Sequence, residues 1–134
     1  MSELKELAAE AKHELLTHII PFWRGMRDDK FGGYYGYLSY DLALDDIDLN
    51  VDKKAVKGCI LNNRILWFFA NAYLLYKDGG ISEEECEAAG FKGEDLLAEA
   101  KHGYKFLREH CIDKEYGGIF WSLNYDGTPL DTTK

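Results

Sequence analysis

One arginine could do chemistry, because it lies in the most apolar stretch of the chain. Arg64 follows Asn62 and Asn63 and precedes the run ILWFF. An arginine in such surroundings is rarely buried without a partner. Either it pairs with one of the many acidic residues, or its guanidinium points into a cavity. In a cavity, its fork of donors can bind substrate oxygens or a developing enolate charge. The residues alone leave both alternatives open.

Helical spacing decides which neighbours share a side of the helix with Arg64. Trp67 lies three positions later, so it projects from the same side and can form a cavity wall. Asn62 lies two positions earlier, so it projects to a different side. If Arg64 points into a cavity, we therefore expect Trp67 rather than Asn62 to line that cavity beside it.

The four histidines do not have the spacing of a metal site. His13 and His18 are five positions apart, and His102 and His110 are eight apart. A helical metal site needs a pair at i and i+4. We expect these histidines at the surface or at helix ends, and we expect no metal.

An acidic run imitates the opening of a calcium-binding loop. Residues 46–52 read DIDLNVD, but the sixth position is Val51 instead of glycine and the twelfth is Lys57 instead of glutamate. We expect a solvated acidic loop there.

Composition limits the classes of partner. The chain has 134 residues and a net charge of −8, which argues against nucleic acid and anionic membranes. No apolar run approaches the ~20 residues of a membrane helix. Three widely spaced cysteines indicate reduced, buried thiols rather than a disulfide framework. We expect a cytoplasmic protein with a neutral small-molecule partner.

The chain should form mainly helices. A first helix should begin near Ser2, bury one stripe of its surface, and kink or end at Pro21. The residues of that stripe are Leu4, Leu7, Ala8, Ala11, Leu15 and Ile19. A helix over 60–77 is apolar on most sides, so we expect it to pack on more than one side. A short helix should begin at Ser82, with Glu85 as its capping partner, and another helix should run over 93–110.

A phrase occurs twice, with an offset of 85 residues from Asp28 to Asp113. It reads DDKFGGYYGYLSYD at 28–41 and DKEYGGIFWSLNYD at 113–126. No Lys-Ser or Lys-Thr follows either Gly-Gly pair, so we expect turns with short aromatic strands rather than phosphate loops. Trp121 should pack within the second copy.

Such a helical repeat buries its apolar face on neighbouring repeats. Two copies are too few to close such a structure. We therefore expect an incomplete piece that exposes apolar surface around Trp67, Phe68 and Phe69 and can self-associate.

Three strings together resemble a known family. They are PFWRGMRDDKFGGYYGY, KGCILNNRILWFFANAY and DKEYGGIFWSLNYDGTPLDTTK. They resemble the N-acylglucosamine 2-epimerase superfamily, and within it most closely the cellobiose 2-epimerases, from about Leu15 to Lys134. The resemblance implies an all-α fold, the N-terminal part of an (α/α)6 barrel with Gly-Gly β-hairpins between helix pairs. Residues 1–134 would be one incomplete segment of that domain.

The resemblance also implies an activity. Such enzymes reversibly convert the reducing-end glucose of cellobiose, lactose or similar disaccharides to mannose, through a cis-enediolate and without a cofactor. Arg64 falls on the family's active-site arginine, and we expect Tyr35, Asn62 and Trp67 to help bind the sugar. The two catalytic histidines lie outside this chain, so the chain alone should be inactive.

Two other interpretations stay open. One is an epimerase or isomerase for monosaccharides or N-acylated sugars. The other is a helical binding or scaffold module without catalysis.

Overall fold

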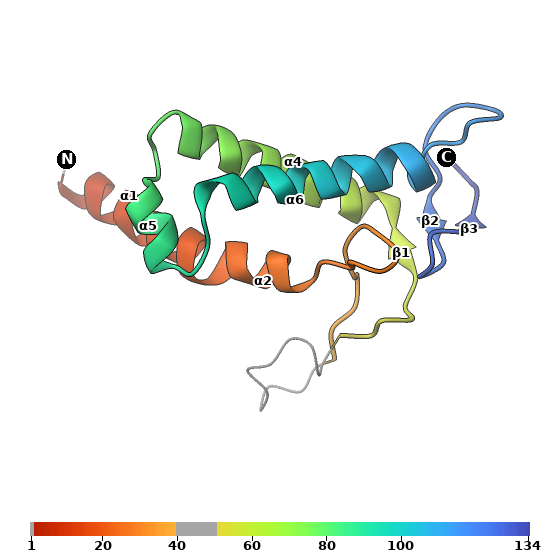
Figure 1. The fold of residues 1–134 in the computed structure, drawn as a ribbon, viewed down its shortest axis with the longest axis horizontal. Coiled ribbons are helices and arrows are strands. Elements are labelled where there is room, and N and C mark those ends of the chain that lie inside the picture. The colour runs from red at the N-terminus through yellow and green to blue at the C-terminus, as the bar shows by residue number, and fades with distance from the viewer. Residues whose placement is uncertain (1, 40–50) are drawn as a thin grey trace.

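The computed structural model describes residues 2–39 and 51–134 as a mostly helical chain with a small antiparallel sheet (Figure 1). The acidic run at 46–52 lies almost wholly outside the described residues. None of the described helices has both the length and the apolar character needed to cross a lipid bilayer. The elements in chain order are α1 (Ser2–Glu14), η1 (Leu15–Ile19), α2 (Ile20–Gly25), β1 (Lys57–Gly58), α4 (Cys59–Lys77), α5 (Glu83–Ala88), α6 (Gly93–Phe106), η2 (Leu107–Cys111), β2 (Ser122–Leu123) and β3 (Pro129–Asp131).

The helices α4 and α6 lie side by side in opposite directions, and α2 runs alongside them (Figure 1). Gly103 of α6 allows close approach to α4, because a Cβ there would lie only 3.2 Å from the Leu66 Cβ of α4. The largest core cluster forms between these helices. Its buried residues are Leu16, Ile20, Met26, Tyr34, Ile65, Phe69, Ala72, Ile81, Cys86, Phe91, Leu96 and Ala100.

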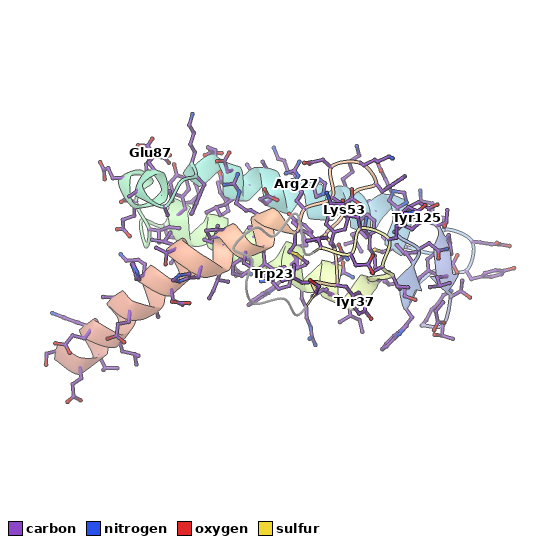
Figure 2. All side chains as sticks on the ribbon, turned by 90° about the horizontal axis from the view of Figure 1, so that it is seen from below. Trp23, Arg27, Tyr37, Lys53, Glu87 and Tyr125 are labelled. Carbon is purple, nitrogen blue, oxygen red and sulfur yellow. The ribbon has the colours of Figure 1, made fainter. Side chains whose placement is uncertain are left out.

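The predicted stripe of the first helix is wrong. No residue of α1 is buried, and Leu4 and Leu7 are 68% and 61% exposed. Leu4 and Leu7 stay exposed because the N-terminal part of α1 projects away from the other helices (Figure 2), whereas Leu15, near the end of the stripe, packs against the core. Burial begins only at Leu16 and Ile20, where the helix reaches the core.

Pro21 does not end the first helix. The helical path continues to Gly25, and Pro21 lies in the first turn of α2. The preceding segment η1 is a π-helical turn, in which the Ile20 N–H bonds to the Leu15 carbonyl. A wide turn at this point accommodates a proline that lacks an N–H.

The apolar helix α4 buries one side within the described chain. Its buried residues are Cys59, Asn62, Ile65, Phe69 and Ala72. Ile60, Trp67 and Leu74 are exposed on the other side. The prediction that this helix packs on more than one side is therefore not met among residues 2–39 and 51–134. Of the expected exposed aromatics Trp67 is exposed, but Phe69 is fully buried.

Two predictions about the later helices can be compared directly with the structure. The Ser82 hydroxyl accepts from the Glu85 N–H at 3.1 Å, so the predicted cap of α5 is confirmed. The helix predicted over 93–110 is α-helical to Phe106 and continues through η2 as a π-helical turn.

The small sheet joins the start of α4 to the second copy of the repeated phrase. β2 lies between β1 and β3, and both pairings are antiparallel. Lys57 pairs with Leu123, and Gly58 pairs with Ser122. The sheet therefore fixes where α4 begins relative to the second copy.

The described parts of the two copies, 28–39 and 113–126, form the same loop around their Gly-Gly pairs. In the first copy Asp28 N–H donates to Gly33 O at 3.0 Å, and Gly32 N–H donates to Asp28 O at 3.1 Å. In the second copy Asp113 and Gly118 form the first bond at 2.9 Å, and Gly117 and Asp113 form the second at 3.0 Å. All four glycines have positive φ, the conformation for which glycine is favoured. The sequence repeat is thus a structural repeat.

A lysine closes each loop through its aspartate. In the first copy Lys57 Nζ donates to Asp28 Oδ2 at 2.5 Å and to Gly32 O at 2.8 Å. In the second copy Lys134 Nζ donates to Asp113 Oδ2 at 2.6 Å. The first pair is almost fully buried, whereas the Lys134 side chain is 35% exposed.

Replacing Lys57 with methionine should lower the free energy of unfolding by about 3–5 kcal/mol, because Asp28 would stay behind as an unpaired buried charge. Urea denaturation followed by circular dichroism measures the loss. Lys134→Met is the matched control and should lose clearly less, because its pair contacts solvent. Equal losses from the two variants would contradict this ranking.

Candidate functional site

A groove of ≈ 440 Å³ lies at the start of α4, where the two copies of the loop meet. Its walls come from the first loop, from β1 and the first turns of α4, and from the second loop with β2. The lining residues are Gly36, Tyr37, Val56, Gly58, Ile60, Leu61, Arg64, Trp121 and Ser122.

Arg64 supplies the charge of this groove. It lies in the second turn of α4 and is exposed to solvent. No ion pair or hydrogen bond joins the Arg64 side chain to another residue within 2–39 or 51–134. The interpretation of Arg64 as a structural partner of an acidic side chain therefore finds no support in this part of the chain. Its donors stay available to a ligand.

Two aromatic side chains line the same groove as Arg64. Tyr37 is 60% exposed and Trp121 is 54% exposed, and both line the groove. The prediction that Trp121 packs inside the second loop is wrong. Its backbone is fixed instead, because Cys59 N–H donates to Trp121 O and Trp121 N–H donates to Asp131 O, each at 3.1 Å.

The offset of 85 residues between the two copies relates the groove residues that were not predicted. Gly36 in the first copy corresponds to Trp121 in the second, and Tyr37 corresponds to Ser122. All four line the groove. Comparing equivalent positions of the two copies was therefore a signal that could have found them.

Asn62 holds the wall of the groove in position through hydrogen bonds. It is 3% exposed, and its Oδ1 accepts from the Tyr34 N–H at 2.8 Å. Its Nδ2 donates to Gly58 O at 3.1 Å. The side chain thus ties α4 to the first loop and to a residue of the groove wall. In this structure its amide is occupied by backbone groups, which gives it a positioning role.

The approach of Asn62 also explains one glycine. A Cβ on Gly33 would lie 2.7 Å from Asn62 Oδ1 and 2.8 Å from a Phe106 ring carbon. Gly33 also has a φ of 68°, which disfavours any side chain. Any larger residue would therefore push the first loop off α4.

Tyr35 and Trp67 are not among the residues that line the groove. Tyr35 is half-buried, and the Lys57 ammonium lies 5.4 Å from the centre of its ring. Trp67 is 69% exposed on α4. Of the four predicted sugar-binding residues, the structure brings only Arg64 to the groove. Sugar contacts of the other three stay predictions.

The histidines do not reach the groove either. The expectation that all four lie at the surface or at helix ends is wrong for His102, which is half-buried within α6 and bonds to Gly33 O at 2.8 Å. His18 is exposed and lies 3.0 Å from Glu14. Within residues 2–39 and 51–134, no three His, Cys, Asp or Glu side chains are placed to bind a metal ion.

Buried charges anchor the first loop. Burial raises the pKa of Asp28, but the Lys57 ammonium and backbone amides outweigh it and bring that pKa below its ordinary value. Burial lowers the pKa of Lys57 more than Asp28 raises it. Lys57 lies one residue before Gly58, so its contact with Asp28 ties the first loop to the groove wall.

A second buried group ties this loop to α6. The Tyr34 hydroxyl donates to the Glu99 carboxylate at 2.6 Å, and burial together with this bond raises the pKa of Tyr34. Arg24 and Arg27 lie 3.4 Å and 3.5 Å from the same carboxylate. The loop is thus fixed to α4 through Asn62 and to α6 through Tyr34.

The groove combines groups suited to a polar, uncharged ring. An available guanidinium donates to hydroxyl or carbonyl oxygens and stabilises negative charge on them. Flanking aromatic rings offer apolar faces together with polar edges. The groove thus offers hydrogen-bond donors for oxygen atoms next to apolar surface for a ring.

Solved structures of similar fold define the class of protein. The chain superposes on the crystal structure of a sugar epimerase from a ruminal bacterium with a TM-score of 0.73 and 45% identity. The match covers 94% of this chain and 27% of that one. No family model matches the chain.

Named relatives narrow the class further. The chain is 46% identical to a cellobiose 2-epimerase of Ruminococcus albus over 128 residues, 96% of this chain and 27% of that protein. It also superposes on the cellobiose 2-epimerase of Bacillus thermoamylovorans with a TM-score of 0.75 and 38% identity, over 95% of this chain and 27% of the other. The predicted resemblance to the cellobiose 2-epimerases is confirmed. The chain spans about a quarter of the length of these relatives.

Asn62→Ala should lower the free energy of unfolding by about 1–3 kcal/mol, because the buried Tyr34 N–H would lose its acceptor. Asn63→Ala is the matched control. Asn63 is half-buried and its side chain bonds to no other described residue, so this variant should lose no more than about 0.5 kcal/mol. Urea denaturation compares the two, and similar losses would argue against the positioning role of Asn62.

Proposed function

We propose that this chain forms one wall of the sugar site of a cellobiose 2-epimerase. The reaction reversibly inverts C2 of the reducing-end glucose of a β-1,4-linked disaccharide and gives mannose. Arg64 carries the proposal, because its guanidinium has no partner among the described residues and lines a groove together with two exposed aromatic side chains. The identity of 46% to a cellobiose 2-epimerase over nearly the whole chain supports the choice of reaction.

In this proposal Arg64 binds the oxygens at C1 and C2 of the opened sugar. Removal of the C2 proton places negative charge on those oxygens in the enediolate. A guanidinium already in position stabilises that charge more than it stabilises the neutral sugar, which is what accelerates the step. The proton returns to the opposite face of C2, so the reaction needs no net change of protons or electrons.

The aromatic side chains of the groove have a separate role. We place Tyr37 and Trp121 against the apolar faces of the sugar rings, where stacking binds the substrate and the intermediate about equally. Asn62 positions the wall through Gly58 and Tyr34. Tyr35 and Trp67 remain weaker candidates for sugar contacts.

The acid and base must come from other groups. His102 bonds to the backbone of the first loop, and none of the four histidines lines the groove. We propose that histidines elsewhere in an (α/α)6 barrel supply proton transfer, as the resemblance implies. This chain alone should then be inert toward cellobiose.

A chimera tests the proposal directly. The aligned segment of the Ruminococcus albus enzyme is replaced by this chain, and the conversion of cellobiose to its mannose-ended epimer is followed by NMR. The chimera should be active, and Arg64→Ala should lower kcat/KM by about 100-fold or more, the usual loss for one donor to a developing oxyanion.

Matched controls separate chemistry from folding. Arg64→Lys keeps the charge but not the fork, so it should recover part of the activity. Arg108→Ala removes an exposed arginine outside the groove and should leave activity unchanged. Full activity of Arg64→Ala would overturn the role of Arg64. Robust turnover by this chain alone would overturn the proposal that the histidines for proton transfer lie outside this chain.

A further inference from the structure

Two cysteines far apart in the sequence meet in a small core of their own. Cys59 begins α4 and Cys111 ends η2, and both are 0% exposed. Phe106 and Leu123 complete this buried cluster. The two thiols are close enough to hydrogen-bond to one another. Both are free in this structure.

The backbone around the two thiols is fixed by neighbouring residues of one segment. Cys111 O accepts from the Phe120 N–H at 2.9 Å, and Cys59 N–H donates to Trp121 O at 3.1 Å. Consecutive residues of the second loop therefore bond to the two cysteines. Their proximity follows from the sheet and the loop, and it does not depend on one side-chain rotamer.

The third cysteine provides a contrast. Cys86 is equally buried, but it belongs to the other core cluster, among residues of α4, α5 and α6. Burial raises the pKa of its thiol, and nearby glutamates add to the effect. The chain thus contains one close pair of thiols and one separate buried thiol for comparison.

We propose that Cys59 and Cys111 are an oxidation site, at which a small peroxide converts the two thiols to a disulfide. One thiolate attacks a peroxide oxygen, the O–O bond breaks, and a sulfenic acid and one water form once a proton is taken up. The second sulfur then attacks the sulfenic sulfur. An S–S bond forms, the S–O bond breaks, and a second water leaves with the remaining proton. Two thiols are oxidised, and one hydrogen peroxide is reduced to two waters.

The burial of both thiols limits the rate of this reaction. Complete burial means that peroxide enters only when the sheet or the helix end opens locally. The reaction is therefore slow in the native protein and faster in mild denaturant.

The disulfide would covalently link the start of α4 to the end of η2. The closed loop contains all of α4, α5 and α6. A cross-link across so long a segment restricts the unfolded chain more than the folded one. The oxidised chain should therefore melt at a higher temperature than the reduced chain, by about 5–10 °C.

Peptide mapping of the oxidised chain tests the proposal. The whole chain is treated with hydrogen peroxide in its native state, the remaining thiols are alkylated after unfolding, and the products are analysed by mass spectrometry. The expected product is a monomer lighter by two hydrogens, with the Cys59 and Cys111 peptides joined and Cys86 alkylated. Dithiothreitol should restore three alkylated cysteines and the lower melting temperature.

Variants give the matched comparison. Cys86→Ser should still form the bond, whereas Cys59→Ser and Cys111→Ser should not. The mapping of the unmutated chain decides the question even if a serine variant folds poorly. Failure to find the joined peptide, a joined peptide that contains Cys86, or an unchanged melting temperature after the bond has formed would overturn the proposal.

Discussion

The buried ion pair between Asp28 and Lys57 is the contact on which the rest of this structure depends. Asp28 also accepts from two backbone amides of its own loop, and Lys57 also donates to Gly32 O. One pair therefore fixes the shape of the first loop and the point at which α4 begins. A buried charge pair adds little net stability over an apolar pair, but it permits only one arrangement of its partners. The second loop has the same plan, with Lys134 on Asp113.

The groove follows from this repeated plan. Each loop contributes two equivalent positions, and α4 emerges between the loops with Arg64 in its second turn. Because Asn62 and Tyr34 tie the first loop to α4 and α6, the guanidinium is presented by a rigid wall. A preorganised donor of this kind favours chemistry in which charge develops on a bound oxygen. The related proteins of known structure are named as a sugar epimerase and a cellobiose 2-epimerase.

The sequence was informative where local chemistry decides the structure. The apolar helix before Lys77, the Ser82 cap and the Gly-Gly turns follow from propensity and spacing, and the structure contains them. Periodicity failed for the first helix, because an apolar stripe such as that of Leu4 does not reveal whether a partner exists to bury it. The meeting of Cys59 with Cys111 was equally out of reach, because it depends on which strands pair. Trp121 was misjudged because its burial depends on tertiary position rather than on its type.

The most direct test of the account is the response of the tryptophan side chains to a disaccharide. The chain has three tryptophans, so its indole N–H groups give three NMR signals that can be assigned by mutation. Trp121 lines the groove with Arg64, whereas Trp23 packs against Phe22 elsewhere. On titration with cellobiose the account predicts a saturable shift of the Trp121 signal, lost in Arg64→Ala, with the Trp23 signal unmoved. A saturable shift that spares Trp121, or one that persists unchanged without Arg64, would contradict it.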